Sequence, residues 1–285
     1  MKIFKSNSID RPSVSIVIFK IVTIILAIAI LFPYVWLVST SLLTREEFYS
    51  SSQPFFSSSP QWGRYYTVLI EQKFYRSIVN SIMLAGIGVL QNIFISPFVA
   101  YGLSRFRFKG RYAVFICILS TMFLPAQVTS IPKFLFYKRL GWLYTYLPLI
   151  VPGFFGAATS ILFTMSFMKI IPREMDEAAK IDGCNHFRIW LFIIMPQLIP
   201  VLCLLGLNTF IGHWKNSYAP MIYLRDPDMF TVPLTLLKFQ TNDSLADVGR
   251  LKLYVALVIA IVPVAVLFLF LQNLMNKYVV VAELK

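Results

Sequence analysis

Few side chains in this sequence have the types and the spacing that catalysis or metal binding requires. The three cysteines, Cys117, Cys184 and Cys203, fall in separate predicted elements and indicate neither a disulfide framework nor a metal site. The two histidines, His186 and His213, are too isolated to form such a site. No glycine-rich Walker loop is present. We therefore expect no catalytic residue, no metal and no cofactor.

The polar side chains of most interest are uncharged and lie within long apolar runs. Their amides could hydrogen-bond a neutral, hydroxyl-rich solute on a path across a membrane. They could instead bond one helix to another, which is common in helix bundles and is the favoured interpretation for any single residue. The candidate pathway residues are Asn80, Gln91, Asn92, Gln127 and Asn208.

Charged side chains are missing from the middle of these runs, where no Asp, Glu, Lys, Arg or His occurs. Ion-coupled and proton-coupled carriers commonly place an ionisable group there to bind the coupling ion. The sequence of the runs therefore disfavours a secondary carrier.

Six charge-free runs must position these residues. Each run has at least 21 residues, and a helix needs about 20 to cross the hydrocarbon core. Transmembrane β-strands would alternate apolar and polar residues, which these runs do not. With 58% apolar and 14% charged residues, the chain lacks the charged surface of a soluble domain. We predict an all-α membrane protein with six transmembrane helices, at residues 21–44, 77–104, 112–132, 140–168, 189–214 and 253–276.

The net charge of +13 fits a membrane protein better than a nucleic-acid-binding one, because Lys and Arg collect in cytoplasmic loops and against anionic headgroups. An even number of spans places both termini on one side. The proposed cytoplasmic side holds 14 of the 26 Lys and Arg, which decides little. Four of the seven residues at 105–111 are basic, and this density in a short loop favours cytoplasmic termini.

The predicted organisation has four parts. Residues 1–41 form a cytoplasmic N-terminus and a first helix that is retained rather than cleaved. Residues 42–76 form an extracytoplasmic loop, 77–276 a core of five transmembrane helices, and 277–285 a cytoplasmic tail. Residues 48–62 are rich in Ser, Pro and aromatic residues, which predicts an irregular loop. Residues 215–252 are long enough for a short helix or a re-entrant hairpin, broken by prolines.

The loop between the fourth and fifth runs, at residues 170–190, predicts a short helix. Pro172 suits its first turn, and three acidic residues follow near the positive end of the helix dipole. Gly183 can take the left-handed conformation that ends a helix, and Asn185 suits the N-cap of the next one. The pair Ala178 and Ala179 would let another protein pack closely. An ordinary surface helix is the alternative, and local physics favours it.

A motif in this loop favours a helix that docks on another protein over an ordinary surface helix. Glu177-Ala-Ala, Gly183 and the Ile193-x-Met195-Pro196 string resemble the EAA loop of ABC importer permeases, with Met195 where the family often has Leu. The rest of the chain is similar to carbohydrate importers whose second permease resembles the maltose-type subunit. The matching strings are AYGLSRFRFKGR at 100–111, MFLP at 122–125, IP at 131–132, LG at 140–141 and KYV at 277–279. Two departures are Lys215 in a Trp-Asn-x motif and a tail that lacks the usual glycines.

The resemblance implies a type I ABC importer permease, a transport subunit and not an enzyme, in the cell membrane. It implies that Glu177, Ala178, Ala179, Asp182 and Gly183 dock on a cytoplasmic ATPase. The implied partners are a homologous second permease, two ATPase subunits, an extracytoplasmic binding protein and membrane lipid, with no nucleic acid. The implied solute is a sugar or oligosaccharide. Glycerol phosphate or a peptide is the alternative solute, and a secondary carrier or a membrane scaffold is the alternative class.

Overall fold

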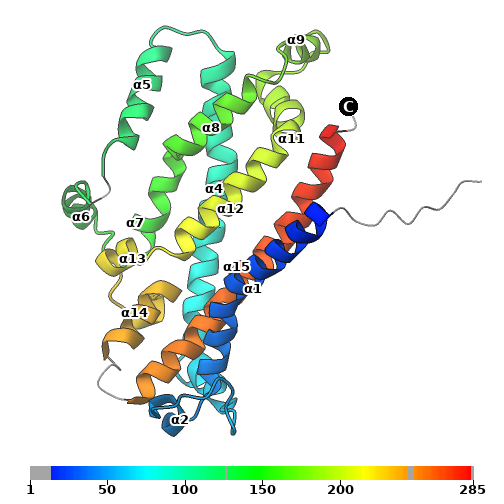
Figure 1. Ribbon diagram of the computed structural model, residues 1–285. Helices are drawn as coiled ribbons and strands as arrows, with labels where there is room; N and C mark the ends of the chain where they lie inside the picture. Colours follow the sequence, from blue (N-terminus) through cyan, green and yellow to red (C-terminus); the bar gives the residue numbers. More distant parts are fainter. Residues whose placement is uncertain (1–13, 126, 243–246, 284–285) are drawn as a thin grey trace, which may run out of the picture.

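The computed structural model describes residues 14–125, 127–242 and 247–283, and the described residues form helices and loops without a strand (Figure 1). The predicted all-α class is confirmed. The long elements are α1 (Val14–Leu42), α4 (Phe74–Arg105), α8 (Ala158–Met168), α12 (Ile199–Trp214) and α15 (Asp247–Glu283). Three short elements lead into α8 or α12, namely α7 (Leu147–Ile150), the 3-10 turn η2 (Val151–Phe155) and α11 (Met195–Gln197).

The number of spans differs from the six that the sequence predicts. Among the described residues, four helices are long and apolar enough to cross a membrane, at Ile18–Leu42, Phe74–Arg105, Leu147–Met168 and Gly249–Phe270. A fifth span consists of His186–Gln197 and Ile199–Trp214, which meet at a bend of 80°. Pro200 lacks the amide hydrogen that would continue the helix across this bend. The bend therefore follows from the sequence at that point.

The third predicted run, 112–132, is not one helix. Helix α5 (Arg111–Met122) ends three residues before Pro125, and α6 (Ser130–Arg139) begins after a turn. Twelve residues of helix rise about 18 Å, which is short of the roughly 30 Å hydrocarbon core. A residue before proline is disfavoured in the helical conformation, which explains why an apolar run of sufficient length fails to form one helix.

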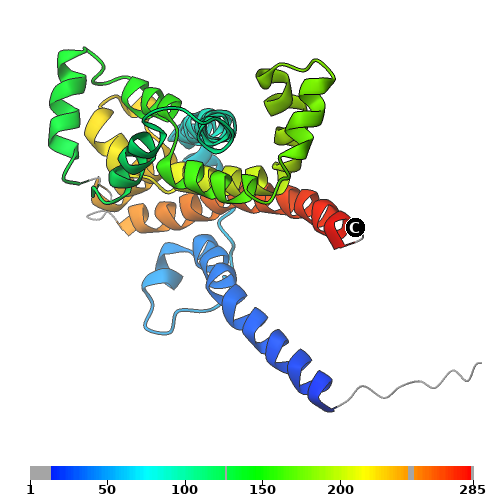
Figure 2. The same ribbon diagram turned by 90° about the horizontal axis from the view of Figure 1, so that it is seen from above.

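Helices α4, α8 and α12 form the centre of the molecule, where α4 packs along both of the others. Two buried clusters support them. One joins α4, α8 and α9 (Glu174–Ile181) through residues such as Tyr101, Met168 and Ala179. The other joins the start of α4 to α14 (Val232–Asn242) and α15. Helix α1 diverges from this group (Figure 2), and none of its most apolar window is buried.

The predicted loops separate toward two ends of the molecule. The turn between α4 and α5 lies at the same end as α9, and the C-terminal end of α15 lies in that half (Figure 1). Helices α2 (Arg45–Tyr49) and α14 lie toward the other end. The segment that begins at Lys215 contains α13 (Tyr218–Tyr223), the turn η4 (Pro227–Met229) and α14, so of the two predicted alternatives, a short helix or a re-entrant hairpin, its described residues form short helices.

The serine-rich segment after α2 is irregular, as predicted, yet it is held in place by one carboxylate. Glu47 accepts hydrogen bonds from the Ser57 hydroxyl at 2.6 Å and from the Ser58 hydroxyl and amide at 2.6 and 2.9 Å. It also closes a capping box with Thr44 at the start of α2. These donors, with those of Ser57 and Ser58 first, lower the pKa of Glu47 to about 2.

Candidate functional site

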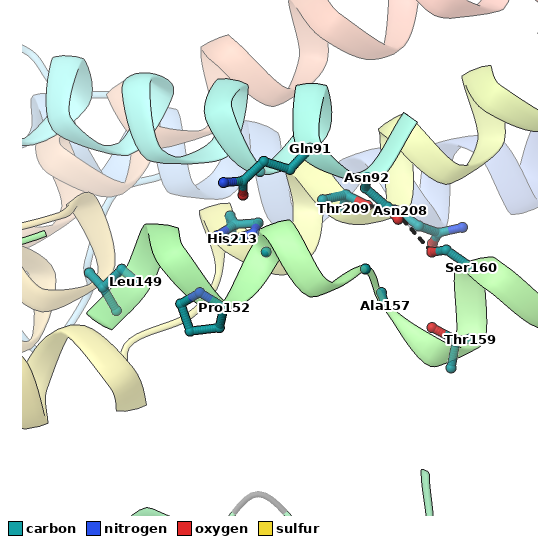
Figure 3. A pocket seen from close by; sticks show the side chains of 13 residues that line it. Gln91, Asn92, Leu149, Pro152, Ala157, Thr159, Ser160, Asn208, Thr209 and His213 are labelled. Carbon is teal, nitrogen blue, oxygen red and sulfur yellow. Dashed lines mark hydrogen bonds between the residues drawn. The ribbon is translucent and has the colours of Figure 1, made fainter. Parts of the chain in front are cut away.

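A cavity of about 460 Å³ lies between α4, the α7–η2–α8 stretch and α12 (Figure 3). It collects three of the five predicted pathway residues. Its lining is composed of small, amide, hydroxyl and imidazole side chains with few apolar ones, and among the described residues it includes no Lys, Arg, Asp or Glu. The lining residues are Gly88, Gln91, Asn92, Leu149, Pro152, Gly153, Gly156, Ala157, Thr159, Ser160, Asn208, Thr209 and His213.

Asn92 ties the three helices around the cavity together. Its amide nitrogen donates to the hydroxyls of Ser160 at 2.9 Å and Thr209 at 2.5 Å, and its oxygen accepts from Ser96 at 2.6 Å. The side chain is buried, so each of these bonds satisfies a group that would otherwise be costly to bury. For Asn92 the helix-to-helix interpretation therefore holds, and its role at the cavity is to position the walls.

Gln91 spans from α4 to the break between α7 and α8. Its amide nitrogen donates to the carbonyl of Ile150 at 3.0 Å, and its oxygen lies directly against Gly153. A Cβ atom at Gly153 would overlap that oxygen, so only glycine allows the approach. The break between α7 and α8 thus brings the Ile150 carbonyl to the Gln91 side chain of α4 at the cavity wall.

Three other polar side chains remain available to a ligand. Asn208 and Thr159 are exposed and, within the described part of the chain, form no side-chain hydrogen bond. His213 is half-buried with its ring against Gly88, where a Cβ atom would overlap it. Neither Thr159 nor His213 is among the pathway residues predicted from the sequence, where His213 is considered only as a metal ligand. Nothing in the neighbouring sequence marks either residue as part of a site. The break between α7 and α8 brings Thr159 to the cavity, and an apolar run of sequence does not reveal such a break.

The other two predicted pathway residues lie elsewhere. Asn80 donates to the carbonyls of Asp228 at 2.9 Å and Phe230 at 3.1 Å, and so joins the start of α4 to the segment before α14. Gln127 is exposed in the turn between α5 and α6, where its carbonyl accepts from Ser130. The structure does not bring either residue to the cavity.

Helix α9 is the short helix that residues 170–190 predict. Gly183 has φ +80° just beyond its end, and the Asn185 side chain accepts from the amide of Arg188 at 2.9 Å. Pro172 precedes the N-cap, Arg173, instead of lying in the first turn. The two alanines differ, since Ala178 is exposed whereas Ala179 is buried against the chain's own core. Glu177, Asp182 and Gly183 are exposed beside Ala178.

A buried ion pair connects α9 to the end of α4. The Arg105 Nε lies 2.9 Å from Asp176 Oδ2, with 8% and 9% of the two side chains exposed. Arg105 also donates to the Ile171 carbonyl at 3.0 Å, and Arg173 donates to that of Ser104 at 3.2 Å. Burial raises the pKa of the Asp176 carboxyl, and Arg105 is the strongest opposing influence.

Comparisons with known proteins decide the family. Residues 92–280 match the model of the binding-protein-dependent transport system inner membrane component. The chain belongs to this family. The matched region begins at Asn92 and includes α8 and α12, which line the cavity together with α4, as well as the exposed helix α9.

Relatives of the permease match over most of its length. The trehalose/maltose transport system permease protein MalG of Thermococcus litoralis is 30% identical over 261 residues, which cover 90% of this chain and 91% of the relative. The arabinooligosaccharides transport system permease protein AraQ of Bacillus subtilis is 29% identical over 70% of each chain. A crystal structure of a bacterial ABC transporter involved in the import of the acidic polysaccharide alginate matches 92% of this chain and 98% of its own, with 26% identity and a TM-score of 0.79. The predicted membership of the ABC importer permeases is confirmed, and the chain is a multi-pass inner-membrane transport subunit.

Proposed function

We propose that this permease carries a neutral sugar or oligosaccharide and that the cavity forms part of its path. The observation that carries the proposal is the cavity's lining, where Asn208 and Thr159 offer unpaired polar atoms without a neighbouring charge. Amides and hydroxyls are suited to sugar hydroxyls because each can donate or accept a hydrogen bond. The names of the relatives, which refer to trehalose and maltose or to arabinooligosaccharides, support the same class.

Other relatives are named for acidic carbohydrates, such as polygalacturonan or sulfoquinovosyl glycerol. An anionic solute, including a glycerol phosphate, would lose hydration in the cavity and would need a cation in exchange. Among the described residues the cavity includes no Lys or Arg, and His213 is its one titratable side chain. The lining therefore favours a neutral solute.

The solute proposal can be tested in proteoliposomes that contain the assembled transporter. Asn208→Leu replaces an unpaired cavity amide, and Gln127→Leu makes the same change outside the cavity. We expect the first variant to lower the uptake of a neutral oligosaccharide about fivefold, since a hydrogen bond contributes roughly 1 kcal/mol, and the second to leave it unchanged. Equal uptake by the two variants would exclude the cavity, and stimulation of ATP hydrolysis solely by acidic solutes or peptides would exclude a neutral sugar.

The proposed partners are a homologous second permease, two ATPase subunits and an extracytoplasmic binding protein, with both termini and α9 in the cytoplasm. In this arrangement ATP hydrolysis belongs to the partner subunits. Glu177, Ala178, Asp182 and Gly183 would contact the ATPase, and their exposure on α9 supports this role. Ala179 would act from the inner side, by holding α9 against the core.

Movement of α9 has a direct route to the cavity. The ion pair between Asp176 and Arg105 joins α9 to α4, and Asn92 joins α4 to α8 and α12. Closure of the ATPase dimer on ATP would move α9 and tilt these helices together, exposing the cavity to one side of the membrane and then the other. ATP drives the change because it binds the closed state more tightly.

The docking role of α9 predicts a specific loss. Glu177→Lys reverses a charge on its exposed face, whereas Glu46→Lys makes the same reversal on α2 at the other end. We expect Glu177→Lys to remove the ATPase from the complex that co-purifies from detergent, because a reversed charge in the contact removes its electrostatic complementarity. Retention of the ATPase by this variant at the level of Glu46→Lys would contradict the docking assignment.

A further inference from the structure

A second cavity, of about 520 Å³, lies at the α9 end of the molecule where α4, α5 and α8 meet. Its walls are mostly apolar, and two cations, Arg111 and Lys169, are among its lining residues. Within the described residues neither cation has an acidic partner or a side-chain hydrogen bond. The remaining lining residues are Leu103, Phe108, Gly110, Tyr112, Phe115 and Met165.

We propose that this cavity is a binding site for an anionic phospholipid. Arg111 and Lys169 would hold the phosphate, and the apolar walls would cover the first part of the acyl chains. Basic pockets between transmembrane helices at the membrane surface are suited to such headgroups, because two cations neutralise a charge that lipid tails cannot solvate. The proposal does not depend on which solute the permease carries.

The position of the two cations at helix ends supports a lipid over a soluble anion. Arg111 begins α5 and Lys169 follows the last residue of α8, so both cations lie where apolar helices end. Tyr112 is 73% exposed beside them, and its ring stacks on that of Phe115 at a centroid distance of 6.5 Å. Exposed tyrosines at helix ends are typical of the level of the headgroups.

The surrounding loop adds charge of the same sign. Arg107 and Lys109 are exposed and, in the part of the chain that the structure describes, also have no acidic partner. By contrast, the cations next to them are already engaged, Arg105 with Asp176 and Arg173 with a carbonyl. The basic residues of this loop thus form two groups. Arg105 is held in the buried ion pair, whereas Arg107 and Lys109 are free to contact anionic lipid.

The test uses the assembled transporter in detergent and native mass spectrometry, with phosphatidylglycerol and phosphatidylethanolamine of the same acyl chains. Arg111→Gln with Lys169→Gln removes the two cations of the cavity. Lys133→Gln with Lys138→Gln removes two exposed cations of α6 and serves as the matched control. Recovery of the complex at wild-type subunit ratios is established first for each variant, and Arg111→Lys with Lys169→Arg tests whether charge alone restores binding.

We expect the wild type to retain phosphatidylglycerol over phosphatidylethanolamine. The cavity variant should bind phosphatidylglycerol about thirtyfold more weakly, which corresponds to about 2 kcal/mol for two cations near an anionic surface, and the control and the charge-conserving variant should match the wild type. Equal retention of both lipids, or wild-type retention by the cavity variant, would overturn the proposal. Displacement of the lipid by millimolar inorganic phosphate would reassign the cavity to a soluble anion, and a partner subunit cross-linked through Tyr112 would reassign it to an interface.

Discussion

Helix α4 carries an ion pair at each of its ends, and the two pairs differ in their surroundings. Near its start Arg76 pairs with Asp228, with 39% and 52% of the side chains exposed. At its end Arg105 pairs with Asp176, with less than a tenth of either exposed. Water screens the first pair, so its partners can separate at little cost. The second pair cannot separate without leaving a buried charge, so α4 and α9 must move together.

The largest expected effect follows from breaking the buried pair. Asp176→Asn keeps the shape of the side chain but leaves Arg105 buried without a counter-charge, which costs about 3–5 kcal/mol. Asp228→Asn at the other end should cost far less, because water screens the exposed pair. The melting temperatures of the purified complexes, together with solute-stimulated ATP hydrolysis, measure the difference. If both variants melt alike, burial does not distinguish the two ends of α4.

A middle-sized effect is expected at the cavity, between the two ends. Gly153→Ala places a methyl group on the Gln91 oxygen, so this side chain must move and lose its hydrogen bond to Ile150, at a cost of about 1 kcal/mol. Gly86→Ala meets no atom within 4 Å and should be neutral or slightly stabilising in a helix. Thermal unfolding and uptake by the two variants provide the measurement. If the two variants have the same melting temperature, the backbone around η2 accommodates a methyl group as readily as an open surface does.

The smallest effect is expected in the loop beyond α2, where the contacts are exposed. The pKa of Glu47 is about 2, below its ordinary 4.5, so its hydrogen bonds contribute fully above pH 4.5 and are lost as the pH falls toward 2. Protease cleavage within residues 50–59 should therefore rise over this window, and Glu47→Gln should be cleaved faster already at pH 7. Cleavage that is independent of pH in the wild type would contradict the role of this carboxylate.

The spans and the helix α9 could be predicted because each depends on a local pattern. Runs of apolar residues identify most membrane helices, and Gly183 and Asn185 mark the end of one helix and the start of the next. The third run misled because its length was counted across Pro125, where the helix has already ended.

The site was predicted in part because the sequence gives residue types but not directions. Gln91, Asn92 and Asn208 reach the cavity, whereas Asn80 and Gln127 are equally polar and lie outside it. Arg105 and Asp176 are far apart in the chain, and a single sequence does not indicate that they pair. Their contact depends on how α4, α8 and α9 pack, which is a property of the whole fold.

The isolation of α1 has a consequence for biosynthesis. Its contact with α15 lies near its C-terminal end, where Trp36 meets Tyr254 edge to face at 5.9 Å. The ribosome therefore releases α1 more than 200 residues before the helix that it packs against. During that interval α1 can contact only the chain that follows it closely, such as Arg64 and Tyr65 at its C-terminal end, and its apolar window is long and apolar enough to insert without α15. The sequence of α1 thus serves an early stage of translation as well as the finished transporter.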